Sequence, residues 1–81
     1  MATQLVTGLP KNYDLYVLKV FHTDERDGYR KATVEQIEFD DVNDIEMYCL
    51  THEYTYDPDR DLRSECHDDM RLLAVTVWVE E

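Results

Sequence analysis

The chain has 81 residues, of which 43% are hydrophobic, and its 19 acidic and 8 basic residues give a net charge of −11 at pH 7. This length predicts one domain, residues 1–81, and the apolar content is typical of a folded chain instead of a disordered one. The sequence shows neither a signal-peptide pattern nor an apolar run long enough to span a bilayer, so we expect a cytoplasmic protein with two free thiols and no membrane partner.

The first half of the chain predicts a β-hairpin. Residues 13–23 (YDLYVLKVFHT) favour a central strand, because apolar side chains occupy both of its faces. Residues 24–28 end in Asp-Gly, a strong signal for a hairpin turn. Residues 30–39 form the returning strand, and a change in apolar parity predicts a one-residue bulge near Glu35. Residues 3–7 are either a short edge strand or an ordered tail.

A helix follows the hairpin. Asp41 is a suitable N-cap, because its carboxylate can accept a hydrogen bond from the first helical N–H groups. Val42, Ile45 and Cys49 have the spacing of one apolar helix face. We expect this helix to run to about Tyr54.

Residues 55–69 are open to two interpretations. The Asp-Pro pair at 57–58 is typical of a helix start, and Leu62, Cys66 and Met70 are four residues apart. These features predict a second short helix, and a long acidic loop is the alternative.

Residues 72–79, which are apolar on both faces, predict a further strand. The order is therefore β-β-α-(α)-β, an α+β fold. We expect an antiparallel sheet of three strands, or four if residues 3–7 join it, with one or two helices on one face.

Two sets of residues resemble metal sites. Cys49, His52, Cys66 and His67 are of the types that bind zinc, but the adjacent Cys66 and His67 fit known ligand spacings poorly. Cys49 also falls on the apolar helix face, where a free cysteine behaves as a small hydrophobe. The sequence therefore assigns no zinc ligand.

Alternating carboxylates at Asp57, Asp59 and Asp61 resemble the start of a calcium loop. Leu62 stands where such a loop needs glycine, and Asp68 stands where it needs glutamate. No glycine-rich phosphate loop is present, and no nucleophile and base can be assigned complementary roles. We therefore expect no cofactor and no catalytic residue, and a protein that is not an enzyme.

The acidity itself is the remaining functional signal. Residues 1–34 carry a net charge of +1, whereas residues 35–81 carry −12. A row of carboxylates can imitate the negative charge of a nucleic-acid backbone, and tyrosines among them are favoured at binding hot spots. The predicted partner-binding residues are Asp40, Asp41, Asp44, Glu46, Tyr48, Glu53, Tyr54, Tyr56, Asp57, Asp59, Asp61, Glu65, Asp68 and Asp69.

In size, acidity and element order the chain resembles phage-encoded inhibitors of host machinery, such as anti-CRISPR proteins, anti-restriction DNA mimics and small inhibitors of bacterial RNA polymerase. The resemblance implies an inhibitor that occupies a basic, nucleic-acid-binding site on a host protein in the bacterial cytosol, as a monomer or homodimer, without itself binding nucleic acid. One alternative is a modulator of a host enzyme that acts through its sheet or as a homodimer. Another is a zinc- or calcium-binding regulator.

Overall fold

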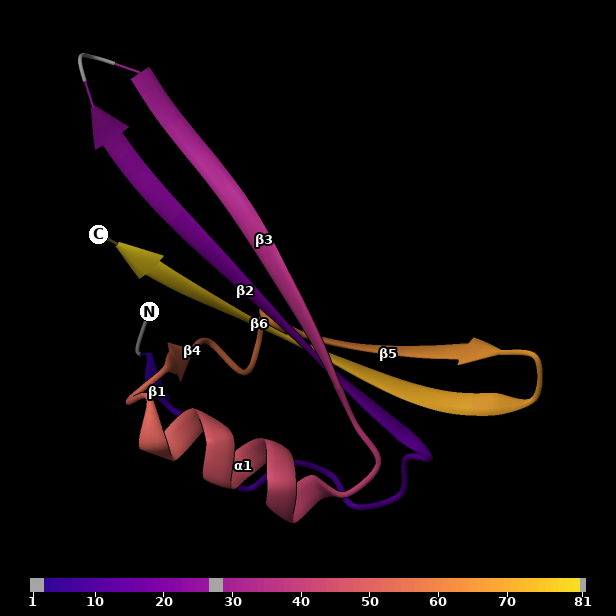
Figure 1. Ribbon diagram of the computed structural model, residues 1–81. Coiled ribbons are helices and arrows are strands. Elements are labelled where there is room, and N and C mark those ends of the chain that lie inside the picture. Colours follow the sequence, from indigo (N-terminus) through magenta and orange to yellow (C-terminus); the bar gives the residue numbers. More distant parts are fainter. Residues whose placement is uncertain (1–2, 27–28, 81) are drawn as a thin grey trace.

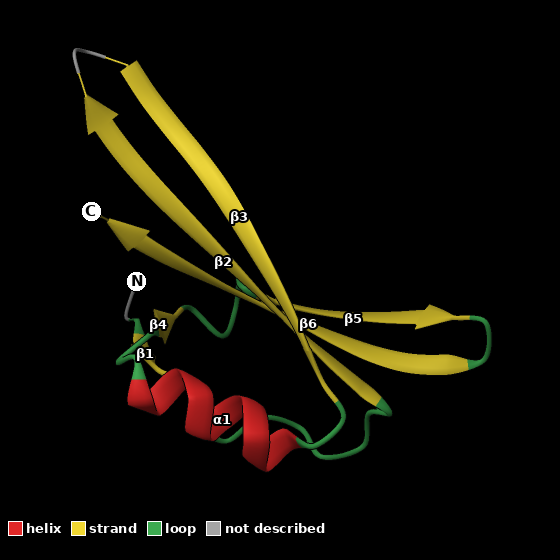
Figure 2. Cartoon of the chain, viewed as in Figure 1, coloured by secondary structure: helices red, strands yellow, loops and turns green. Residues whose placement is uncertain are grey.

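The computed structural model describes residues 3–26 and 29–80, and it has the expected α+β class. A mixed sheet of four strands, a second sheet of two strands and one helix make up this part of the chain (Figures 1 and 2). The elements are β1 (Gln4–Leu5), β2 (Leu15–Arg26), β3 (Tyr29–Phe39), α1 (Val42–Thr51), β4 (Thr55–Tyr56), β5 (Leu62–His67) and β6 (Met70–Glu80).

The strands of the larger sheet lie in the order β3-β2-β6-β5. Strands β2 and β3 are antiparallel, as are β5 and β6, but the central strands β2 and β6 run parallel. The expectation of a purely antiparallel sheet is therefore wrong. Because residues 62–67 form a strand, the chain reverses direction once more before β6, which then follows the direction of β2. Strand β1 does not join this sheet but pairs with β4.

The β2–β3 hairpin is regular over its whole length. Its register runs without interruption from the pair Tyr16 and Phe39 to the pair Arg26 and Tyr29, so the predicted bulge near Glu35 is wrong. Strand β3 lies at the sheet edge, and its apolar residues are divided between the two sheet faces: Ile37 lies opposite Leu18 on the core face, and Val34 lies opposite Phe21 on the other. The change in apolar parity therefore reflects apolar residues on both faces and needs no bulge. The predicted Asp-Gly turn falls on residues 27–28, which lie outside the described residues, and the rest of the predicted turn is part of β2.

Helix α1 begins as the sequence predicts. The Asp41 carboxylate accepts a hydrogen bond of 3.1 Å from the backbone N–H of Asn43, which satisfies one of the unpaired donors of the first turn. The helix buries Val42, Ile45 and Cys49 against the sheet, in agreement with their spacing.

The helix ends at Thr51, three residues before the predicted end. Glu53 has a φ of 56°, and its N–H donates to the carbonyl of Leu50, while the N–H of Tyr54 donates to the carbonyl of Cys49. This is the Schellman arrangement, in which a left-handed residue stops the helix. Glycine is the usual residue there, so the glutamate gave no stop signal in the sequence.

The predicted second helix is wrong, although residues 57–61 begin like one. Asp57 caps a single turn, because its carboxylate accepts from the N–H of Asp59 and its carbonyl accepts from the N–H groups of Arg60 and Asp61. The turn then stops at Asp61. Its carboxylate accepts from the N–H of Asp57, and its carbonyl accepts from the N–H of Thr76 on β6. The chain thereby enters the sheet as β5.

Strands β5 and β6 are joined by the two residues Asp68 and Asp69. Their φ values are 50° and 64°, and the register pairs His67 with Met70. Two positive φ values in a two-residue loop are what a type I′ hairpin turn requires. The sequence Asp-Asp lacks the glycine that normally signals such a turn.

The core lies between one face of the larger sheet and the layer formed by α1, β1 and β4 (Figures 1 and 2). Leu18 and Val20 of β2, Val75 and Val77 of β6, and Ile45 of α1 have no exposed surface. Each such side chain contributes about 1.5–3 kcal/mol through burial. No described element covers the opposite sheet face, which we call the open face.

Candidate interaction surfaces

One end of the molecule gathers acidic residues from four segments. The start of β2 lies beside the start of β6, because the N–H of Asp14 donates to the carbonyl of Arg71 at 2.9 Å. The end of β3, the start of α1 and the β5–β6 turn lie on the same side of the molecule (Figure 1). We call this group the acidic end, and it consists of the exposed residues Asp14, Asp40, Asp41, Asp44, Glu65, Asp68 and Asp69.

Arg71 lies beside this group, because its backbone N–H donates to the Asp14 carboxylate at 3.2 Å, and its guanidinium lies 4.9 Å from the ring centroid of Tyr13. Six of the seven acidic-end residues were predicted from the sequence. Asp14 was not, because it precedes β2 in the nearly neutral first half of the chain, and only the parallel pairing of β2 with β6 brings it to this end.

Two other predicted carboxylates lie away from the acidic end. Glu53 follows the C-terminus of α1, which the length of a ten-residue helix separates by about 15 Å from the N-terminus. Asp59 lies in the turn before β5. Both are exposed, but they do not form one surface with the acidic end.

Three predicted partner-binding residues have little exposed surface. Tyr56 is buried, and its hydroxyl donates to the carbonyl of Thr7 at 3.3 Å. Asp57 and Asp61 are also buried, and their carboxylates accept the hydrogen bonds that form the 57–61 turn. These side chains therefore stabilise the fold and present little surface to a partner.

Glu46 has a structural contact as well. Its carboxylate accepts a hydrogen bond of 3.1 Å from the N–H of Leu9, which holds the N-terminal segment against α1. The Asp41 cap is likewise part of the helix, although its side chain remains exposed.

The remaining predicted tyrosines form an aromatic cluster along α1. Tyr48 lies 5.6 Å from Phe39, 4.4 Å from His52 and 6.3 Å from Tyr54, measured between ring centroids. The rings of His52 and Tyr54 are stacked. Tyr48 and Tyr54 are only partly buried, so this cluster offers apolar contact surface on the helical side.

Of the residues that resemble a zinc site, the described side chains of Cys49, His52 and Cys66 do not assemble. Cys49 is buried in the core, and Cys66 is exposed on β5. Burial, with a smaller effect of the Glu46 charge, raises the pKa of the Cys49 thiol to about 12, so this thiol stays protonated at neutral pH. Among the described residues, no group of three or more His, Cys, Asp or Glu side chains is arranged to hold a metal ion.

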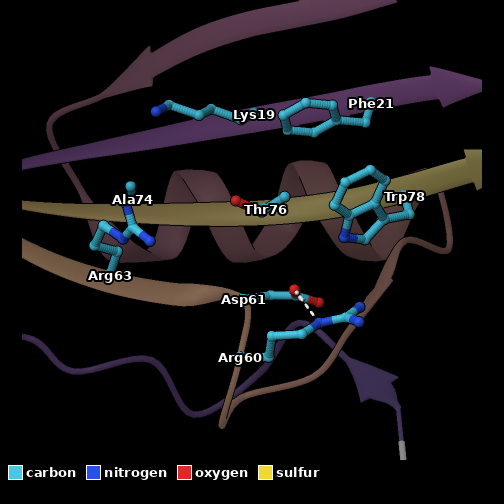
Figure 3. Close-up of a pocket in the computed structure, with 8 residues that line it drawn as sticks. All are labelled: Lys19, Phe21, Arg60, Asp61, Arg63, Ala74, Thr76 and Trp78. Atoms are coloured by element: carbon cyan, nitrogen blue, oxygen red, sulfur yellow. Dashed lines mark hydrogen bonds and ion pairs between the residues drawn. The ribbon is translucent and has the colours of Figure 1, made fainter. Parts of the chain in front are cut away.

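The open face carries a second candidate surface that the sequence reasoning missed. A hollow of about 340 Å³ lies over β2, β6 and the start of β5, beside the 57–61 turn (Figure 3). We call it the sheet hollow. Eight residues line it, of which three are basic and one is acidic: Lys19, Phe21, Arg60, Asp61, Arg63, Ala74, Thr76 and Trp78. An excess of basic over acidic side chains is unexpected in a protein whose net charge is −11.

One signal in the sequence pointed to this hollow. Lys19, Thr76 and Trp78 interrupt the apolar pattern of the two central strands, each on the side opposite to the core residues. A lysine and a tryptophan in strands that are otherwise apolar on both faces indicate that one face is open.

Comparison with known proteins gives no relative of this chain. No protein-family model matches it, and neither a curated protein nor a solved structure is found to be similar. Within residues 3–26 and 29–80, no helix has the length and apolar character needed to cross a membrane.

Proposed function

We propose that the protein is a non-enzymatic inhibitor whose acidic end occupies a basic, nucleic-acid-binding site on a bacterial host protein in the cytosol. The observation that carries this proposal is that seven exposed carboxylates, from four segments of the chain, lie toward the same side of the molecule. Such a concentration of one sign of charge steers the molecule toward a positive groove and away from nucleic acid.

The acidic end is also arranged on rigid supports. Asp41 and Asp44 belong to the first turn of α1, and Asp68 and Asp69 form a tight turn between two paired strands. Carboxylates held in this way lose little conformational entropy on binding, which favours affinity. Tyr48, on the adjacent helical side, is the aromatic anchor that we assign to the same contact.

The test compares two variants that lose the same number of charges. Asp44→Asn with Asp69→Asn removes two carboxylates from the acidic end, and Glu53→Gln with Asp59→Asn removes two exposed carboxylates elsewhere. Each variant is used to compete with labelled DNA for bacterial enzymes that bind nucleic acid, at several salt concentrations.

We expect the original protein to displace DNA, with an affinity that falls steeply as salt rises. The first variant should lose at least about tenfold in affinity, and the second should change less than about threefold. An affinity that is insensitive to salt, or equal losses in the two variants, would count against the proposal.

A second candidate is a modulator that acts through its sheet or as a homodimer, and exposed apolar side chains favour it. Val34 on the edge strand β3 lies opposite Phe21, which lies opposite Trp78 on β6. Val34 and Trp78 are about half exposed, at 54% and 49%. In this case the protein should self-associate at micromolar concentration in sedimentation experiments, and Val34→Lys should restore the monomer, whereas Asp44→Asn with Asp69→Asn should not.

A further inference from the structure

The sheet hollow has an aromatic wall at one end. The rings of Phe21 and Trp78 are stacked, with centroids 4.5 Å apart and planes 25° from parallel. Trp78 nevertheless remains 49% exposed, and its position on β6 places it on the open face. An indole that is held by a stacked neighbour and still faces solvent is a platform on which another planar ring can stack.

The other end of the hollow is positively charged. Lys19 lies on the central strand β2, and its neighbours across the strands are the uncharged Gln36 and Thr76. Arg63, on β5, lies beside Ala74. Neither Lys19 nor Arg63 forms an ion pair within 4.0 Å among the described residues.

The described acidic side chains of this face form no ion pair with these two cations within 4.0 Å. The Asp61 carboxylate is paired with Arg60 at 3.1 Å and accepts from the backbone of Asp57. Glu65 of the acidic end lies two residues from Arg63 along β5, and Glu38 on β3 lies diagonally from Lys19. Neither carboxylate forms an ion pair with these cations within 4.0 Å.

Figure 3 shows how the two ends are related: Lys19 and Arg63 lie at one end, Phe21 and Trp78 at the other, and Thr76 lies between them. From Trp78 to Ala74, beside Arg63, the strand covers four residues, or about 13 Å. The hollow therefore offers a ring platform, a central hydroxyl and two cations in a row, in a volume at the lower limit of small-molecule sites.

We propose that the sheet hollow binds one nucleoside phosphate, whose base stacks on Trp78 and whose phosphate accepts hydrogen bonds from Lys19 and Arg63. The Thr76 hydroxyl lies where it can hydrogen-bond the sugar. A single nucleotide suits this site better than a polynucleotide, because the phosphate backbone of a long strand would be repelled by the acidic end and by the net charge of −11. This site is independent of the inhibitor function proposed above.

The chain itself supplies the reporter for a test, because Trp78 is its single tryptophan. The protein is titrated with adenosine 5′-diphosphate, adenosine 5′-monophosphate, adenosine, inorganic phosphate and a twelve-nucleotide oligothymidylate while Trp78 emission is recorded. A parallel titration of N-acetyltryptophanamide corrects for light absorbed by the base.

We expect saturable quenching by the two nucleotides, and at least about tenfold weaker binding of adenosine or phosphate alone, because each lacks one of the two contacts. Arg63→Gln should weaken nucleotide binding about tenfold. Arg71→Gln, an exposed arginine of the same β5–β6 hairpin at the acidic end, should change it less than about twofold. Circular dichroism should confirm that both variants fold, since both side chains are exposed.

Three results would overturn the proposal. Absence of saturable quenching by either nucleotide would show that the hollow is not such a site. Tighter binding of the oligonucleotide than of the nucleotides would indicate a single-strand binding surface instead. Emission that changes with protein concentration alone would indicate that a second copy covers the open face.

Discussion

Asp61 provides the sharpest test of how the fold is held together. Its buried carboxylate accepts from the N–H of Asp57 at 2.9 Å and from the Arg60 Nε at 3.1 Å. Replacement by alanine removes both bonds and leaves the N–H of Asp57 buried without a partner, which costs about 1–3 kcal/mol. For a domain of this size, a loss of about 2 kcal/mol lowers the melting temperature by roughly 8–16 °C.

The measurement is urea unfolding of three variants, followed by circular dichroism. Asp61→Ala should show the full loss with little change in the dependence of the unfolding free energy on urea concentration. Asp61→Asn should lose about 1 kcal/mol, because its amide oxygen can still accept from the N–H of Asp57. Asp59→Ala is the matched control, and it should lose less than about 0.5 kcal/mol because the side chain is exposed. Equal stability of Asp61→Ala and Asp59→Ala would refute this account of the turn.

Three further predictions concern two residues with positive φ, Glu53 and Asp69, and the titration of the buried Cys49 thiol. Glu53→Gly should raise the unfolding free energy by about 0.5–1 kcal/mol in urea unfolding, because glycine adopts a φ of 56° without strain, whereas Glu53→Ala should not. Asp69→Gly should raise the melting temperature for the same reason, and Asp69→Ala should fail to do so. Stability should also fall as the pH rises from about 9 toward 12, since the unfolded state loses the Cys49 proton before the folded state does. In Cys49→Ala, unfolding measured between pH 8 and about 10.5 should show a shallower loss, while the raised pKa values of Tyr54 and Tyr56 leave part of the dependence in place.

The alanine variants decide the first two of these predictions. If Glu53→Ala or Asp69→Ala stabilises the protein as much as glycine does, removal of a negative charge is the cause instead of relief of strain. The pH prediction is contradicted if Cys49→Ala and the original protein lose stability with the same slope.

The elements with strong local signals were predictable from the sequence. Strand β2 contains residues 15–23 of the predicted strand 13–23, and residues 72–79 lie within β6, because β-branched and aromatic residues dominate both segments. The start of α1 was predictable because Asp41 followed by Val42 and Ile45 combines a cap with an apolar face.

The wrong helix end and the wrong second helix share one cause, which is that aspartate and glutamate occupy positions where glycine or asparagine normally signals a turn. Glu53 ends α1, and Asp68 and Asp69 form a hairpin turn, all with positive φ. Without that turn signal, the four-residue spacing of Leu62, Cys66 and Met70 indicated a helix. The partners that favour the strand, among them Thr76 and Val75 on β6, are distant in the sequence.

The candidate surfaces were predictable to different degrees. Counting charges located the acidity in the second half of the chain, and the segments at 40–44 and 65–69 do reach one end. Burial was not predictable, because Asp57 and Asp61 differ from the exposed Asp59 in hydrogen bonds that form only in the folded turn. The lysine and tryptophan in the central strands indicate an open sheet face, but the side chains that line the sheet hollow follow from the parallel pairing of Lys19 with Thr76, which the sequence did not predict.

The parallel pairing of β2 with β6 also has a consequence for how the chain reaches its folded state. Asp14 and Arg71, which join the starts of these strands, are 57 residues apart in the sequence. The central pair of the sheet therefore forms by a slow, long-range closure, and it forms only after the chain has been synthesised through β6. Until then the β2–β3 hairpin has an unpaired apolar edge, which is the state in which this protein is most exposed to aggregation or to chaperones.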